Sequence, residues 1–511
     1  MGWPEAVLGA YLAVLGVLSF NGLHRLWLLW VWARSSPRPT PPFPADPPRV
    51  TVQLPLFDER YVAERVIRAA AALRYPRDRF RIQVLDDSTD DTTAICADVV
   101  AELAAAGLQI ELVHRTDRTG FKAGALERGL STTPDELVAV FDADFVPDPS
   151  FLERTVPHFA DPGVGMVQAR WGHLNADDSW LTRAEATLLD GHFVIEHTAR
   201  NVSGRWFNFN GTAGIWRRDA IVAGGGWQHD TLTEDLDLSY RAQLAGWRFV
   251  YLPEVVAPAE LPADLPAFKS QQHRWAKGSI QTAKKLLARI WRAPVGLPIK
   301  IEATSHLCAN LSYPLVVVLT VLLPFAVAAR TEHANELQTL IRVDLVLFLF
   351  AVLPFVAFYG AAVHGSGAPG RLGRWARLPV VLALGLGMAA SQTRAVLEGW
   401  FGEVGTFART PKRGDARSVV YLAATRGLVW AELALATYLA AAIVYAVSRG
   451  YWGSLPFLLL FAGGYGVVGL GTWFGGRGQS RATDAGTQVT HHSHGASDHR
   501  PVAGSNAANT R

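Results

Sequence analysis

The chain has 511 residues, of which 50% are hydrophobic and only 18% are charged, whereas about 25% of the residues of a soluble protein are charged. The deficit indicates a membrane protein, and the length leaves room for more than one domain, since single cores stop growing at about 250–300 residues. The net charge of +3 is small and gives no reason to expect a nucleic acid partner. Only two cysteines are present, Cys96 and Cys308, which argues against a disulfide framework and fits a reducing compartment.

The first apolar segment, Val7–Trp32, predicts a transmembrane anchor. A bilayer crossing takes about 20 apolar residues, and no small-residue cleavage site follows this segment. We therefore interpret residues 1–34 as a retained anchor and the proline-dense residues 35–48 as a stiff linker. Arginines lie in and after the C-terminal half of the anchor, so the positive-inside tendency predicts that the chain then enters the cytoplasm.

Residues 49–292 alternate between short apolar runs and amphipathic stretches, which predicts a parallel sheet covered by helices. The expected strands are Val50–Leu54, Arg81–Leu85, Ile110–His114 and Leu137–Phe141. The expected helices are Ala63–Leu73, Thr92–Ala106, Ala123–Gly129 and Leu236–Ala245. Leu137–Phe141 is apolar on both faces, so we expect it at the centre of the sheet. A nucleotide site belongs at the carboxyl ends of such strands.

Two of these strands end in acidic residues, Asp86 with Asp87 and Asp142 with Asp144. One such cluster is as typical of a turn as of a site. Two clusters at neighbouring strand ends, one with D-x-D spacing, favour a site for a hard cation. A Mg²⁺ or Mn²⁺ ion there could hold a diphosphate.

The part of the chain after the polar region, residues 293–474, holds further apolar segments and two basic loops. The apolar segments are Leu307–Ala329, Val343–Val363, Leu378–Ala390, Leu428–Val447 and Leu455–Leu470. Both loops belong on the cytoplasmic side, so Leu378–Ala390 is interpreted as interfacial or re-entrant and the chain has about five spans. If residues 378–397 cross instead, there are about six. Residues 475–511 are rich in small polar residues and histidine and are predicted to be disordered rather than a metal site.

Further motifs lie downstream of the acidic clusters, namely Thr233-Glu234-Asp235 and Gln271–Trp275 (QQHRW). They match the T-E-D and Q-x-x-R-W motifs of processive family 2 glycosyltransferases, and the whole set resembles the cellulose synthase superfamily. The stretches that resemble its cellulose synthase-like family A, the glucomannan and mannan synthases, are QVLDDST, FKAGAL, FDADF, VQARW, FNGTAGIW and QQHRW. The resemblance covers about half the chain strongly and implies a GT-A type α/β domain inserted between transmembrane helices.

The resemblance also implies roles for the charged residues. Asp235 would be the general base, although an Asp there could instead cap the following helix. Asp142 and Asp144 would hold a metal and the donor diphosphate. Asp86 or Asp87 would bind the nucleoside with Glu59, which could equally be an exposed charge at a helix start. Lys122 and Arg274 would neutralise phosphate oxygens.

Acceptor and gating residues follow from the same resemblance. Trp275 would be a stacking platform for a sugar ring, although tryptophan is also a common core residue. Gln271 would contact donor or acceptor, and the acceptor pocket would include Phe209, Asn210, Gly211 and Thr212. A gating loop is expected at FARTPK, with Phe407, Thr410 and Lys412, where Arg409 replaces the valine of the family motif. The other tryptophans of the region, Trp171 among them, are expected in the core.

The resemblance implies a processive, inverting enzyme of the plasma membrane, with its catalytic domain in the cytoplasm. It would extend a β-1,4-mannan or glucomannan-like polysaccharide from GDP-mannose or UDP-glucose, in contact with membrane lipids and without nucleic acid. One alternative is a single transfer to a lipid acceptor. Another is a catalytically silent scaffold, which would not need the acidic motifs.

Overall fold

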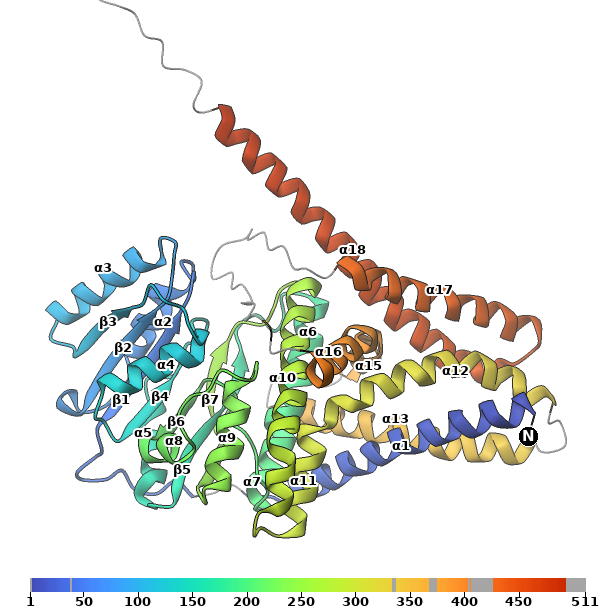
Figure 1. The fold of residues 1–511 in the computed structure, drawn as a ribbon, viewed down its shortest axis with the longest axis horizontal. Helices are drawn as coiled ribbons and strands as arrows, with labels where there is room; N and C mark the ends of the chain where they lie inside the picture. Colours follow the sequence, from blue (N-terminus) through green and yellow to red (C-terminus); the bar gives the residue numbers. More distant parts are fainter. Residues whose placement is uncertain are drawn as a thin grey trace, which may run out of the picture.

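The computed structural model describes residues 2–36, 39–332, 337–366, 375–402, 405 and 426–492. Phe407, Thr410 and Lys412 of the expected gating loop lie outside these residues. The chain forms an α/β domain beside a bundle of long helices, and helix α10 (Leu265–Arg292) stands at the junction between them (Figure 1).

A seven-stranded sheet lies at the centre of the α/β domain, in the order β3-β2-β1-β4-β6-β5-β7. The strands are β1 (Val50–Leu56), β2 (Phe80–Asp86), β3 (Ile110–His114), β4 (Leu137–Val140), β5 (Val164–His173), β6 (Gly214–Arg217) and β7 (Arg248–Ala259). Strands β1 to β4 are parallel, as the sequence predicts, and β4 is central. The sheet is mixed rather than fully parallel, because β6 pairs antiparallel with both β4 and β5.

Helices cover both faces of the sheet, because its central strands are apolar on both. Alternate residues of β4 enter different cores, Leu137 and Ala139 on one face and Val138 and Val140 on the other. The first face packs against α2 (Ala63–Ala71), α3 (Thr92–Ala105) and α5 (Phe151–Thr155). The second face packs against α4 (Phe121–Thr132), α8 (Arg218–Ala223) and α9 (Glu234–Leu244). Short 3-10 turns lie at Arg77–Arg79 and Val156–Ala160.

A helical layer joins the α/β domain to the bundle (Figure 1). It consists of α6 (Trp180–Asp190), the π-helical turn η3 (Gly191–His197), α7 (Thr198–Val202), α10 and α11 (Leu297–Leu307). Val194 and Ile195 of η3 pack against Leu28 and Phe358 of the bundle. The junction is therefore an apolar core in its own right.

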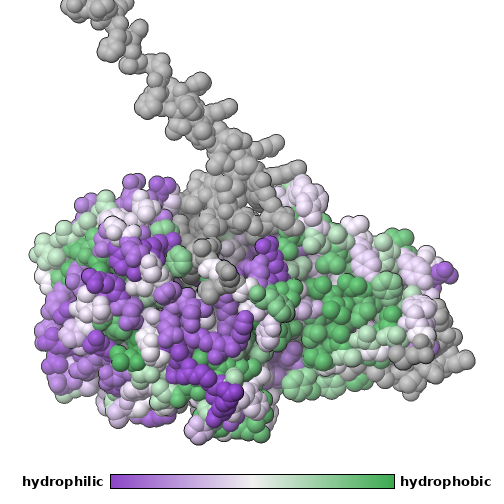
Figure 2. Space-filling view, viewed as in Figure 1, coloured by the Kyte–Doolittle hydropathy of each residue, from purple (hydrophilic) through white to green (hydrophobic). Residues whose placement is uncertain are grey.

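The bundle contains α1 (Trp3–Ala33), α12 (Ser312–Glu332), α13 (Leu337–Gly365), α15 (Leu378–Gly387), α16 (Ala389–Phe401), α17 (Arg426–Ser448) and α18 (Leu455–His492), with 3-10 turns at Ala309–Leu311 and Trp452–Ser454. Among the described residues, 4 helical stretches are long and apolar enough to cross a membrane: Trp3–Ala33, Ala309–Ala329, Leu428–Ser448 and Trp452–Phe474. A fifth candidate is the pair α15 and α16, which is bent by 46°. Figure 2 shows that the bundle surface is largely apolar, whereas the α/β domain is mostly hydrophilic.

Two further sequence predictions fall in this part of the chain. Helix α18 continues to His492 and so covers the first part of the segment 475–511, which the sequence predicts to be disordered. The segment Val343–Val363 falls within the 29-residue helix α13, whose stretch Leu349–Gly365 is apolar but shorter than a full span.

Candidate active site

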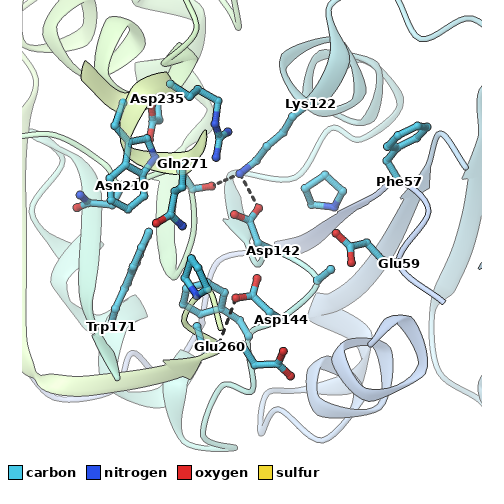
Figure 3. A pocket seen from close by; sticks show the side chains of 18 of the residues that line it. Phe57, Glu59, Lys122, Asp142, Asp144, Trp171, Asn210, Asp235, Glu260 and Gln271 are labelled. Carbon is cyan, nitrogen blue, oxygen red and sulfur yellow. Dashed lines mark hydrogen bonds and ion pairs between the residues drawn. The ribbon is translucent and has the colours of Figure 1, made fainter. Parts of the chain in front are cut away.

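A cavity opens at the carboxyl ends of the parallel strands, where the sequence predicts the site. Of the predicted residues, the cavity is lined by Glu59, Asp87, Lys122, Asp142, Asp144, Asn210, Gly211, Asp235, Gln271, Arg274 and Trp275. They come from the ends of β1, β2 and β4, from the loop before β6, from the first turn of α9, and from α4 and α10. Figure 3 shows Asp142, Lys122, Gln271 and Asp235 around one shared space.

Lys122 holds the first carboxylate of the D-x-D motif. Its Nζ lies 2.5 Å from Asp142 Oδ1 and 2.9 Å from the carbonyl oxygen of Gly211. Burial acts to lower the pKa of Lys122, but the carboxylates of Asp142, Glu234 and Asp235 outweigh it and raise the pKa above its usual value. The ammonium therefore stays charged and is available to a phosphate oxygen.

Asp235 points into the cavity from the first turn of α9 and does not act as its cap. The N-cap is Thr233, and Asp235 Oδ1 accepts the backbone N–H of the adjacent Leu236 at 2.8 Å. Burial and the neighbouring charge of Glu234 raise the pKa of Asp235 to about 7, against the opposing effect of Lys122. A carboxylate with this pKa can take up a proton near neutral pH.

Asp144 is buried beside Glu260, at the end of β7. The backbone N–H of Glu260 donates to Asp144 Oδ2 at 3.2 Å, and Arg65 pairs with Glu260 Oε1 at 2.7 Å. No group of three or more His, Cys, Asp or Glu residues within the described ranges could hold a metal ion by itself. Mg²⁺, however, is commonly bound by one or two carboxylates together with substrate phosphates and waters. The pair Asp142 and Asp144 fits that kind of site.

Asp86 and Asp87 have different surroundings. Asp86 is fully buried, and its carboxylate accepts hydrogen bonds from Ser88, Thr93 and His114. Burial acts to raise the pKa of Asp86, but these hydrogen bonds outweigh burial and lower the pKa below its usual value. Asp86 therefore does not line the cavity, and it stabilises the end of β2. Asp87 does line the cavity, and Arg115 binds both of its oxygens, at 2.7 and 2.5 Å.

The acceptor motif is divided in a similar way. Asn210 and Gly211 line the cavity, whereas Phe209 and Thr212 are fully buried behind it. Thr212 Oγ1 accepts the backbone N–H of Asp142 at 2.9 Å, so it holds the D-x-D loop in place. Phe209 packs on Trp216 in the core, with ring centroids 5.7 Å apart. The sequence could not separate these roles, because neighbouring residues of an extended segment face opposite sides.

Several lining residues were not assigned to the site from the sequence. Trp171 lines the cavity, and its ring centroid lies 6.4 Å from that of Trp275. The signal was its position in VQARW at the end of a strand. Arg118 lies over the ring of Phe57, 3.2 Å from the centroid, beside Glu59. His173 and Glu260 also line the cavity, and no sequence motif points to either residue.

A second cavity adjoins the first and extends toward the bundle. The two share Trp171, Asn210, Asp235, Gln271 and Trp275. The farther wall of the second cavity comes from α12, α13, α15 and α16, through Tyr313, Tyr359, Leu384 and Gln392. The second cavity therefore lies between Asp235 and the apolar helices.

The fold and the cavity define an α/β domain of the GT-A type joined to helices that are apolar enough to cross a membrane, as the sequence predicts. Residues 47–278 match the family model described as glycosyltransferase like family 2. This part of the chain is therefore a family 2 glycosyltransferase domain.

Curated proteins similar to this chain include glucomannan 4-beta-mannosyltransferases. Glucomannan 4-beta-mannosyltransferase 2 of Arabidopsis thaliana is 44% identical over 250 residues, which are 48% of this chain and 47% of the relative. Glucomannan 4-beta-mannosyltransferase 1 of Oryza sativa subsp. japonica is also 44% identical over 250 residues, which are 48% of each chain. The chain thus spans about half the length of these relatives. The resemblance predicted from the motifs is confirmed.

Solved structures show more distant similarity. The mannosyltransferase PcManGT from Pyrobaculum calidifontis, in complex with GDP-Man and Mn²⁺, is 22% identical with a TM-score of 0.47, over 70% of this chain and 98% of that one. S. aureus TarS is 11% identical with a TM-score of 0.37, over 69% of this chain and 54% of that one.

Proposed function

We propose that the protein is an inverting glycosyltransferase that elongates a β-linked polysaccharide of the β-1,4-mannan or glucomannan type from a nucleotide sugar. The observation that carries the proposal is that Asp235, Lys122 and Asp142 surround one cavity together with Arg274 and Trp275. The cavity offers a base, cations for a diphosphate and an aromatic face for a sugar. Because similar proteins are glucomannan mannosyltransferases, GDP-mannose is the first donor to test and UDP-glucose the second.

In the proposed reaction Asp235 removes the proton from an acceptor hydroxyl. The acceptor oxygen then forms a bond to the anomeric carbon, while the bond from that carbon to the diphosphate oxygen breaks on the opposite side. A pKa of about 7 suits Asp235 to this role at neutral pH. Lys122 and Arg274 would bind the departing diphosphate, Arg274 as a planar fork and Lys122 as a point charge.

The remaining donor contacts follow from the lining of the cavity. Asp142 and Asp144 would hold Mg²⁺ or Mn²⁺, and this ion would neutralise charge on the diphosphate. Glu59 and Asp87 would contact the nucleoside, with the fully buried Asp86 acting behind them. Trp275 and Trp171 lie on the side of the cavity that continues toward the bundle and would stack against sugar rings.

Processive growth and passage of the polymer toward the membrane are supported by the second cavity. It leads from Asp235 to residues of α12, α13, α15 and α16, so a lengthening chain could advance without leaving the protein. The FARTPK segment, which resembles a gating loop, would close over the donor. We further propose a plasma membrane location with the α/β domain in the cytoplasm.

A membrane topology of about five spans, in which α13 crosses and the α15–α16 pair does not, is supported by the packing of α16. A Cβ atom on Gly399 of α16 would lie 2.8 Å from the carbonyl oxygen of Lys277 in α10, so the two helices touch. Helix α16 therefore lies against the helix that carries Trp275 and does not continue away from the α/β domain. Labelling of Arg413→Cys, in a chain with Cys96 and Cys308 replaced by alanine, should occur only from the cytoplasmic face. Labelling from the outside would favour about six spans.

The decisive experiment supplies purified protein in lipid nanodiscs with GDP-mannose or UDP-glucose and Mn²⁺, and sizes the products. A ladder that β-mannanase degrades is the expected result. Lipid products carrying a single sugar would instead identify a non-processive transferase. If neither donor yields any transfer, the proposed function is wrong.

A further inference from the structure

The π-helical turn η3 carries two histidines on one face. In an α-helix, residues five apart point in directions about 140° apart, because each residue turns the helix by about 100°. A π-helix closes i→i+5 hydrogen bonds, so residues five apart lie one above the other. His192 and His197 are placed in this way, with ring centroids 4.3 Å apart.

The two imidazoles bind opposite ends of the Asn210 carboxamide. His197 Nε2 lies 2.5 Å from Asn210 Oδ1, and Asn210 Nδ2 lies 3.0 Å from His192 Nε2. An amide oxygen only accepts and an amide nitrogen only donates, so His197 donates from Nε2 and His192 accepts at Nε2. Burial, with the nearby His192 and Arg200, holds the pKa of His197 well below its usual value, which keeps that ring neutral.

The orientation of the His192 ring is fixed by a hydrogen bond at its other nitrogen. A neutral His192 that accepts at Nε2 carries its proton on Nδ1, which lies 3.1 Å from Glu196 Oε2. The same carboxylate oxygen accepts from Arg200 at 3.3 Å, and Arg200 Nε donates to Glu302 of α11 at 2.9 Å. Arg200 and Glu302 are both buried. A chain of hydrogen bonds thus runs from Asn210 into the helical layer.

The backbone of Asn210 is also fixed. Its N–H donates to Gln168 Oε1 at 3.0 Å, while Gln168 Nε2 donates to the carbonyl oxygens of Ala169 at 2.8 Å and of Thr212 at 3.1 Å. Main chain and side chain are therefore both held before any ligand is bound. Such preorganisation lowers the entropic cost of binding.

The Asn210 carboxamide keeps half of its hydrogen-bonding capacity for a ligand. Its oxygen has a second lone pair and its nitrogen a second hydrogen, and Asn210 lines both cavities. Figure 3 shows Asn210 on the same side of the cavity as Asp235 and Gln271. A lone pair beside an N–H matches sugar hydroxyls, which both donate and accept.

We propose that His192 and His197 are positioning residues that lock the Asn210 carboxamide in one orientation, so that its remaining lone pair and N–H bind hydroxyl groups of the acceptor sugar beside Asp235. The inference rests on the proposed function and names the residues that set its acceptor affinity. His192 and His197 themselves do not need to touch the reacting atoms.

The test compares His192→Leu, which removes the acceptor for Asn210 Nδ2, with His192→Gln, whose Oε1 can replace Nε2. The acceptor KM is measured with β-1,4-mannohexaose at saturating GDP-mannose, and the donor KM with GDP-mannose at saturating mannohexaose. We expect His192→Leu to raise the acceptor KM about fivefold to tenfold, as the loss of one oriented hydrogen bond implies, with the donor KM unchanged. His192→Gln should stay close to the native value. His158→Leu is the control, because His158 is a buried histidine that lines neither cavity.

A purely structural role for His192 would change donor and acceptor KM together and would not distinguish Leu from Gln. An unchanged acceptor KM in His192→Leu would overturn the positioning role while leaving the proposed function intact. If the native protein transfers no sugar to mannohexaose or to its own product, the proposed function fails and this inference fails with it. His192→Phe, which keeps the ring packing against Phe193, replaces the leucine variant if that variant does not fold.

Discussion

Lys269 of α10 and Glu432 of α17 form a buried ion pair that joins the α/β domain to the bundle. Lys269 Nζ lies 2.6 and 2.9 Å from the two carboxylate oxygens and 3.4 Å from Thr472 Oγ1 of α18. The two side chains are 1% and 0% exposed. Since α10 also carries Gln271, Arg274 and Trp275, the pair holds one wall of the cavity against the last two apolar helices.

Breaking this pair on one side should destabilise the protein strongly. Lys269→Met leaves Glu432 buried without its cation, which costs about 3–5 kcal/mol for pairs of this kind. The double variant Lys269→Met with Glu432→Leu removes both charges and should recover much of that loss. Thermal unfolding in detergent micelles measures both. The single variant Glu432→Leu completes the comparison. If the double variant loses as much stability as Lys269→Met and Glu432→Leu lose together, the two charges are not coupled.

Asp235→Asn should reduce sugar transfer by about 10²–10⁴-fold, because the amide cannot take the proton of the acceptor hydroxyl. Binding of GDP-mannose, measured by calorimetry, should be retained. Asp219→Asn, on the exposed surface of α8, serves as the matched control and should transfer at the native rate. Elongation by Asp235→Asn at the native rate would remove Asp235 from the mechanism.

The pH dependence of transfer should report the same carboxylate. Burial and Glu234 raise the pKa of Asp235 to about 7, and only the deprotonated form is a base. Activity should therefore rise with pH through about 7 and level off above it. The measurement is kcat/KM for the acceptor across this range. A profile that falls as pH rises through neutrality would contradict the assignment of Asp235 as base.

Gly211→Ala should impair transfer more than it impairs folding. An added Cβ would lie 3.0 Å from Asp235 Oδ2 and 3.4 Å from Lys122 Nζ, and the φ of +81° adds backbone strain of about 1–2 kcal/mol. Gly107→Ala is the control, because Gly107 has a φ of +86° with nothing within 4 Å of an added Cβ. Both variants should lose similar stability in thermal unfolding. Only Gly211→Ala should lose activity.

Removal of divalent metal with EDTA should abolish transfer, and Mn²⁺ or Mg²⁺ should restore it. Asp144→Asn should raise the Mn²⁺ concentration needed for half-maximal activity, since one anionic ligand becomes neutral. Asp148→Asn is the control, because Asp148 lies in the next turn and its carboxylate accepts from Ser150. Full activity in EDTA would show that Lys122 and Arg274 suffice for the diphosphate.

The sequence by itself determined the elements whose signals are local. Apolar periodicity located β1 to β4 and the helices between them, because a strand repeats every two residues and a helix every 3.6. The acidic residues at the ends of β2 and β4 were assigned to one edge of the sheet, since parallel strands end on the same side. Motif resemblance added Asp235 and the Gln271–Trp275 segment, which chain spacing alone does not bring near Asp142.

Only the tertiary structure decided the relations between distant segments. The antiparallel insertion of β6 depends on pairing with β4 and β5, which local periodicity does not encode. The position of the cavity separated Asp86 from Asp87, and Phe209 from Asn210, although each pair is adjacent in the chain. The contact of His192 and His197 with Asn210 arises because a π-helical turn packs beside a loop from elsewhere in the domain. These outcomes depend on which surfaces exclude water together, a property of the whole fold rather than of any one segment.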